Sequence, residues 1–181
     1  MSIVNGEKLD KKFAALESMM QNGMQSQIHK MGMEVRDAAR LRCPERRFGS
    51  GGGALRQSIH VSTEEKADCI VSTVYTNLSY AAYVEFGTGP VGQEKHQGIS
   101  PDINPAYSQT GWIIPGDAMG PQEAEQYGLG IMKGKDGRII GYMTNGQPAQ
   151  PYMYPALKDN EERLLKDMKT EFIANIKKVT K

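Results

Sequence analysis

A long apolar stripe at helical spacing constrains the fold of this chain most strongly. Apolar residues recur every three or four positions, which predicts one helix from about Glu7 to Arg42. Asn22-Gly23 is a predicted bend or break, and Pro44 should end the helix because the residue before a proline disfavours the α region. Core packing is the commoner role of a Met-rich stripe, and peptide binding is the alternative. The stripe comprises Leu9, Phe13, Leu16, Met20, Met24, Ile28, Met31, Val35 and Ala38.

Two predicted hairpins supply the strands. The first pairs residues 58–62 with 68–76 around a turn at 64–67, with many β-branched residues. The second lies within residues 130–146, where Lys133-Gly-Lys-Asp-Gly137 supplies the Asp-Gly of a tight turn.

A second long helix is predicted from about Ala156 to Lys178. We expect it to pack on the N-terminal helix around Ile28, Met31 and Val35, so that Phe172→Ala costs about 3–5 kcal/mol and leaves the protein unfolded or insoluble. The fold class is therefore α+β, with a small, mainly antiparallel sheet of two hairpins packed against the long N- and C-terminal helices. The apolar face of the second helix comprises Leu157, Leu164, Met168, Phe172, Ile176 and Val179.

The chain of 181 residues is long enough for a single domain spanning 1–181. Residues 46–54 form a predicted flexible Gly-rich loop, which lacks the Gly-Lys-Ser/Thr ending of a phosphate-binding loop. Residues 90–127 form a long arm rich in proline and glycine, in which only Gly111–Pro115 suggests a strand. We expect this arm to be mobile in the free chain and to be ordered by neighbouring subunits.

The net charge of the chain bears on whether it binds nucleic acid. The net charge is only +1, which gives no reason to expect a dedicated nucleic-acid binder. Arg46 and Arg47 are candidate DNA-channel residues, and the alternative is a solvated helix end whose cations complement the helix dipole. They belong to the densest basic stretch, which comprises Arg36, Arg40, Arg42, Arg46 and Arg47, with Arg56 beyond.

Neither a membrane span nor a secretory signal is evident, because the chain has no apolar run of about 18 residues. Assembly in the cytoplasm is expected. Cys43 and Cys69 are too few for a disulfide framework and too far apart for a zinc knuckle, so we interpret both as reduced thiols.

No catalytic constellation is evident, and we expect no enzyme activity, no cofactor and no metal. His29, His60 and His96 stand apart in the sequence, without a metal-ligand spacing. Cysteine-protease chemistry through Cys43 would need a histidine and an asparagine that only the fold could place.

A split signature carries most of the functional information. Its first half, Ser79–Gly89, predicts a short helix over Tyr80–Phe86 that Asn77 or Ser79 caps and Gly87 ends. Within it, Glu85 is either solvent-facing or paired with a basic residue of this chain or of a neighbouring subunit.

The second half of the signature, Gly146–Leu157, is kept extended by Pro148, Pro151 and Pro155 and delivers Tyr152 and Met153 to the core. Trp112 either anchors an interface or packs over its own sheet. The candidate interface residues are Tyr80, Tyr83, Glu85, Trp112 and Tyr152.

Together these segments resemble the tailed-phage neck or tail-completion family of the lambdoid type. The shared pieces occur in the same order as in that family: Pro44, Gly53-Ala-Leu-Arg-Gln-Ser-Ile59, Tyr83-Val-Glu-Phe-Gly-Thr88 and Pro148-Ala-Gln-Pro-Tyr-Met-Tyr-Pro-Ala156. The loop at 46–53 is longer than is usual in the family, and so is the 90–127 segment.

The resemblance implies a structural virion protein that helps to join the DNA-filled head to the tail. It implies a homo-oligomeric ring, for which six copies are preferred and twelve are the alternative, between a head-completion or stopper protein and a tail-terminator or tail-tube protein. Non-specific contact with packaged DNA is expected to be local. The alternative is a tail-terminator or another tail-tube protein of the same particle.

Overall fold

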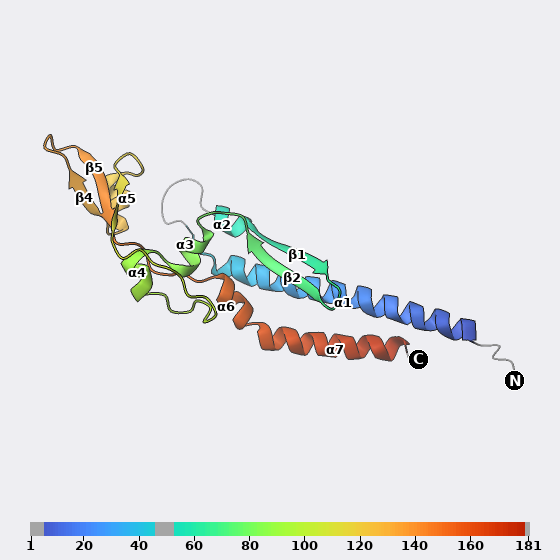
Figure 1. Cartoon of the computed structure of the whole chain (residues 1–181). Helices are drawn as coiled ribbons and strands as arrows, with labels where there is room; N and C mark the ends of the chain where they lie inside the picture. Colours follow the sequence, from blue (N-terminus) through green and yellow to red (C-terminus); the bar gives the residue numbers. More distant parts are fainter. Residues whose placement is uncertain (1–5, 46–52, 180–181) are drawn as a thin grey trace. The chain divides into compact units, whose positions relative to one another are not determined.

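The computed structural model describes residues 6–45 and 53–179, which form two compact units with separate sheets (Figure 1). Unit 1 comprises Met1–Leu41, Ile59–Thr76 and Ala156–Lys181, and unit 2 comprises Arg42–Ser58 and Asn77–Pro155. The predicted α+β class, with antiparallel strands and long terminal helices, is confirmed. The two predicted hairpins lie in different sheets, however, and do not build one sheet.

In unit 1, helix α1 (Gly6–Arg42) is continuous and ends two residues before Pro44. The predicted break at Asn22-Gly23 does not occur. Gly23 instead lies beside helix α7, where a Cβ would stand 3.8 Å from Nδ2 of Asn175. That distance is an ordinary van der Waals contact, so a side chain could be accommodated at Gly23. Gly32 differs, because a Cβ there would lie 2.1 Å from Oγ of Ser72. Gly32 therefore permits the close packing of α1 on β2.

The hairpin of unit 1 consists of β1 (Ile59–Glu65) and β2 (Ile70–Thr76), which pair antiparallel from Ile59↔Thr76 to Glu65↔Ile70. The turn falls at residues 66–69, two positions later than predicted, and the Lys66 N–H donates to the Cys69 carbonyl (2.8 Å). The ladder continues to Glu65 because each added pair satisfies further backbone groups.

The C-terminal region forms two helices, α6 (Met153–Lys158) and α7 (Glu161–Val179), where the sequence predicts one. Asn160 explains the break: its side chain donates to the Ala156 carbonyl (2.9 Å), while its own carbonyl accepts the Leu164 N–H (2.9 Å). Asparagine readily forms such local bonds at helix boundaries.

Helix α7 lies alongside α1, and Arg163 pairs with Glu34 at 2.9 Å (Figure 1). Leu164 is 3% exposed and belongs to the core of unit 1, whereas Phe172 is 38% exposed. The prediction that Phe172 is buried in the core is therefore wrong. The buried apolar residues of unit 1 are Val35, Ala39, Ile59, Ala156 and Leu164.

Unit 2 contains a three-stranded antiparallel sheet of order β3-β5-β4. Strands β4 (Gly130–Lys133) and β5 (Ile139–Thr144) form the predicted second hairpin. Strand β3 (Trp112–Pro115) comes from the 90–127 segment and pairs with β5 in the register Trp112↔Thr144 to Pro115↔Gly141.

The 90–127 segment is more regular than its composition suggests. It contains β3, most of helix α4 (Gly89–Glu94) and helix α5 (Pro121–Gln126), so the prediction of one strand in an otherwise irregular arm is wrong. Both helices carry a proline in the first turn, where its fixed φ favours the helix and its missing N–H costs nothing. Unit 2 also contains the short helices α2 (Ala54–Gln57) and α3 (Ala81–Phe86).

One face of the unit 2 sheet is packed and the other is open. Tyr142 of β5 is buried and donates its hydroxyl proton to the Met119 carbonyl (3.0 Å), and Ala124 of α5 is fully buried. Ile113 and Met143 are register partners, so they share a face, and both are exposed.

Candidate functional site

The two halves of the split signature meet in unit 2. Thr88 and Gln147 form an isolated antiparallel bridge, in which the Thr88 N–H donates to the Gln147 carbonyl (2.9 Å) and the Gln147 N–H donates to the Thr88 carbonyl (3.2 Å). A further bond runs from the Gln150 N–H to the Val84 carbonyl (2.8 Å). We call residues 80–92 together with 145–154 the signature clasp.

Glycines allow the two backbones of the clasp to touch. Gly146 has φ +99°, and a Cβ there would lie 1.8 Å from the Thr88 carbonyl oxygen. Gly87 has φ +76°, and a Cβ there would lie 2.7 Å from the Ala149 nitrogen. Any larger residue at either position would strain the backbone and push the two halves apart. The glycines of the signature therefore serve this contact.

Glu85 joins the two halves of the clasp. Its side chain is buried, and its carboxylate accepts three backbone N–H bonds, from Tyr152 (2.7 Å) and Met153 (3.0 Å) at Oε2 and from Tyr154 (3.0 Å) at Oε1. These are the free N–H groups at the start of α6, which an acidic side chain satisfies and whose dipole it complements.

Glu85 therefore adopts neither of the two arrangements expected from the sequence. It is not solvent-facing, and within residues 6–45 and 53–179 it forms no ion pair. It acts as a helix cap supplied from 67–69 residues away along the chain. No local sequence pattern signals this role, because the carboxylate and the helix start meet only in the folded chain.

Tyr152 lies beside this carboxylate and is also internal. It is 1% exposed, and burial, with the nearby charge of Glu85, raises the pKa of its phenol far above the ordinary value. Cys43 is buried and free, and burial raises the pKa of its thiol, while Arg56 opposes the rise. Cys69 is also free but exposed.

The other three candidate interface residues are exposed. Tyr80 and Tyr83, at α3, are 42% and 59% exposed. Trp112 of β3 is 40% exposed, and its ring packs beside Gly89, where a Cβ would lie 2.9 Å from Cζ3. Trp112 therefore both covers its own unit and presents part of its ring to solvent. The structure separates a buried pair, Glu85 and Tyr152, from three exposed aromatic residues.

Two residues that donate hydrogen bonds to the backbone of the clasp were not singled out from the sequence. The Gln147 side-chain amide donates to the Tyr83 carbonyl (2.9 Å). The Tyr107 hydroxyl donates to the Phe86 carbonyl (2.8 Å), and its ring stacks on His96 with centroids 5.7 Å apart. Tyr107 thus ties the 90–127 segment to α3. A tyrosine in a Pro- and Gly-rich stretch was the only available signal.

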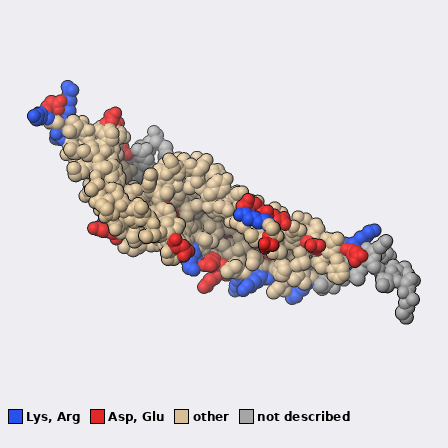
Figure 2. Space-filling model, viewed as in Figure 1, with Lys and Arg blue, Asp and Glu red and all other residues tan. Residues whose placement is uncertain are grey.

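The arginines of the basic stretch, which includes the DNA-channel candidates Arg46 and Arg47, fall into two groups. Arg46 and Arg47 lie outside the described residues. The others have partners: Arg36 pairs with Asp37 (2.7 Å), Arg40 donates to the Ile59 carbonyl (2.8 Å) and Arg56 pairs with Glu45 (2.8 Å). Figure 2 shows cationic and anionic side chains interspersed on the visible face, so no single-sign stripe appears there.

The described residues contain no group of three or more His, Cys, Asp or Glu side chains that could hold a metal ion. His29 is bonded to Thr63 (2.9 Å), and the His60 ring lies tilted against Tyr75, with centroids 5.8 Å apart, so these histidines have structural contacts. No helix among the residues described is long and apolar enough to cross a membrane.

The fold and the clasp define an α+β chain whose signature residues build a backbone junction. Residues 7–87 match a family described as "Bacteriophage HK97-gp10, putative tail-component". This match agrees with the resemblance to a phage neck or tail-completion family drawn from the sequence, and in this part the chain is similar to phage tail components. No curated protein and no solved structure matches the chain.

Proposed function

We propose that this protein is a ring subunit at the neck of a tailed phage or prophage particle, where it helps to join the DNA-filled head to the tail. The observation that carries the proposal is the signature clasp, in which the segments shared with the neck family are fixed to each other by Glu85. Tyr80 and Tyr83 remain exposed on this fixed element. Exposed aromatic residues on a rigid scaffold are typical anchors of protein interfaces.

The proposed partners are further copies of the chain and the adjacent rings. Six copies would match the symmetry of a tail, and twelve would match that of a portal. The head-side neighbour would be a head-completion or stopper protein, and the tail-side neighbour a tail-terminator or tail-tube protein. Packaged DNA would pass through the ring, with Arg46 and Arg47 as candidates for non-specific phosphate contact.

A second candidate function is that of a tail-terminator or another tail-tube protein. The family description, a tail component, supports this role equally well. The two roles differ in what happens to the tail when the protein is missing, because a terminator limits tube length whereas a neck subunit acts after both parts are complete.

Deletion of the gene from an inducible phage, followed by electron microscopy, tests the proposal. We expect filled heads and separate tails of normal length. Tails of uncontrolled length would favour the terminator, and an absence of tails would favour the tube protein. Normal joined particles would overturn all three roles.

Cryo-electron microscopy of intact particles provides the positional test. We expect the protein in the ring between head and tail, in six copies. Complementation with Tyr83→Ala should yield mostly unjoined particles, whereas Tyr75→Ala, an exposed tyrosine on β2 of unit 1, should restore joining. Equal rescue by both variants would show that the clasp surface is not the joining interface.

A further inference from the structure

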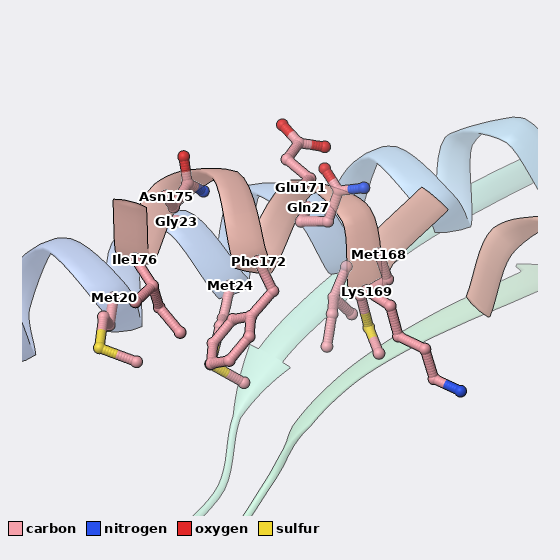
Figure 3. Close-up of a pocket in the computed structure, with 11 residues that line it drawn as sticks. Met20, Gly23, Met24, Gln27, Met168, Lys169, Glu171, Phe172, Asn175 and Ile176 are labelled. Atoms are coloured by element: carbon pink, nitrogen blue, oxygen red, sulfur yellow. The ribbon is translucent and has the colours of Figure 1, made fainter. Parts of the chain in front are cut away.

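An apolar groove lies between α1 and α7 within unit 1 (Figure 3). It encloses about 240 Å³ and is lined on the α1 side by Met20, Met24 and Ile28. Met168, Phe172 and Ile176 line it on the α7 side. Figure 3 shows Met20, Met24, Phe172 and Ile176 extending toward the same side, away from Glu171 and Asn175.

The groove is incompletely filled by the chain itself. Met24 is 42% exposed, Phe172 38% and Ile176 37%, although all three are large apolar side chains. Solvent contact at three neighbouring apolar residues is unfavourable, and burying them would stabilise whatever complex covers them.

Helix α1 continues beyond this groove, and no hydrogen bond or ion pair joins this continuation to another described element of unit 1. In Figure 1 it runs past the β1–β2 turn, where Gln21 bonds to Glu65, and past the C-terminal end of α7. We call residues 10–19 the α1 extension. Phe13 in this extension is 59% exposed and Met19 61%. Among the described residues, the extension makes no hydrogen bond or ion pair with another element.

The extension has the pattern that the groove requires. Phe13, Leu16 and Met20 follow one another at steps of three and four, so the stripe of the extension continues directly into the α1 wall of the groove. Ten residues of helix span about 15 Å, enough to cover the two turns that separate Met168 from Ile176. Packing of such an apolar face against a partner supplies most of the stability of a helical segment in a protein.

The stripe has opposite charges on its two sides. Asp10 and Glu17 are exposed and seven residues apart, which places both on one flank of the extension, next to Phe13, whereas the exposed Lys12 lies on the other flank, four residues before Leu16. Lys169 is exposed on the groove and points out from the α7 wall (Figure 3). An acidic flank facing this lysine would favour one orientation of an incoming helix.

We propose that the α1 extension of one copy of this chain docks, through Phe13 and Leu16, in the α1–α7 groove of a second copy. Extension and groove are different surfaces, so the contact can pass from copy to copy, as a ring requires, or occur twice in a two-fold dimer. The contact does not depend on where in the particle the protein acts.

Disulfide trapping tests the contact. Phe13→Cys and Phe172→Cys are prepared as separate full-length proteins in a Cys69→Ser background, and Cys43 stays buried. After mixing and mild oxidation, we expect at least about tenfold more covalent dimer than either variant gives alone, because only the mixture offers both halves of the contact. No enrichment, with either Phe172→Cys or Met24→Cys as the groove position, would overturn the proposal.

Sedimentation provides a second readout with a matched control. Phe13→Asp should raise the dissociation constant for self-association at least about tenfold, and its monomer should melt like the parent because the side chain is exposed. Leu41→Asp changes an 83% exposed residue of the same helix outside the groove and should associate normally. A wild-type chain that stays monomeric, or equal association by both variants, would overturn the contact. If the disulfide forms but the assembly is not a ring, the extension–groove contact is supported and the proposed neck ring is not.

Discussion

The signature clasp in unit 2 and the α1–α7 groove in unit 1 differ in how completely their side chains are buried and paired. In the clasp, a buried carboxylate has three backbone donors and the glycines leave no spare space. In the groove, three large apolar side chains remain more than a third exposed. A substitution in the clasp should therefore damage the chain itself, whereas one at the groove should mainly affect association.

The largest expected effect is at Glu85. Glu85→Ala removes the acceptor of three buried N–H groups, so the free energy of unfolding should fall by about 3–5 kcal/mol. Urea unfolding measures this loss as a lower midpoint concentration, provided that the dependence of the free energy on urea concentration is unchanged. Glu94→Ala, an exposed glutamate of α4, should stay within about 0.5 kcal/mol of the parent. If the two variants unfold alike, the carboxylate does not hold the clasp together.

Two residues of α7 sharpen the comparison. Leu164→Ala empties a site that is 3% exposed and should cost about 2–5 kcal/mol in the free chain. Phe172→Ala should cost only about 1 kcal/mol, because its ring already contacts solvent. This expectation replaces the unfolding predicted from the sequence. Thermal melting at low protein concentration tests it, and a larger loss for Phe172→Ala would mean that the groove is part of the core.

Two glycines of unit 2 allow the cost of a strained backbone to be measured separately from the cost of a steric clash. Gly146→Ala and Gly137→Ala both place a side chain at positive φ, but only Gly146 also faces the Thr88 carbonyl; nothing lies within 4 Å at Gly137. Gly137→Ala should cost about 1 kcal/mol, and Gly146→Ala at least about 2 kcal/mol. Equal losses in chemical denaturation would show that the two halves of the clasp are not in tight contact.

The smallest effect is a pH dependence at Tyr152. Its pKa is raised in the folded chain, so the unfolded chain, with an ordinary tyrosine pKa of about 10, ionises first. The contribution of Tyr152 is therefore complete below about pH 10 and is lost as the pH rises further. Tyr152→Phe should flatten the alkaline fall in the urea midpoint, whereas Tyr83→Phe, at an exposed site, should preserve it. An identical alkaline profile for both variants would contradict this assignment.

The sequence by itself determined the elements whose causes are local. The apolar period gave the α1 stripe, Pro44 its end, and Asp-Gly the turn of the second hairpin. The family resemblance likewise depended on short segments, and residues 7–87 bear it out. Gly23 was the exception, because Asn22-Gly23 predicts a bend or break from the sequence, whereas α1 is continuous through it.

Only the tertiary structure decided how these pieces satisfy one another. Glu85 looked like a surface or ion-pair residue because its three donors lie 67–69 residues away. Strand β3 was suggested by its sequence, but its partner β5 was not, and the two hairpins were assigned to separate sheets only by pairing and packing. Propensity and periodicity depend on neighbours along the chain, whereas buried hydrogen bonds and strand partners depend on which distant backbone groups the fold brings within about 3 Å of each other.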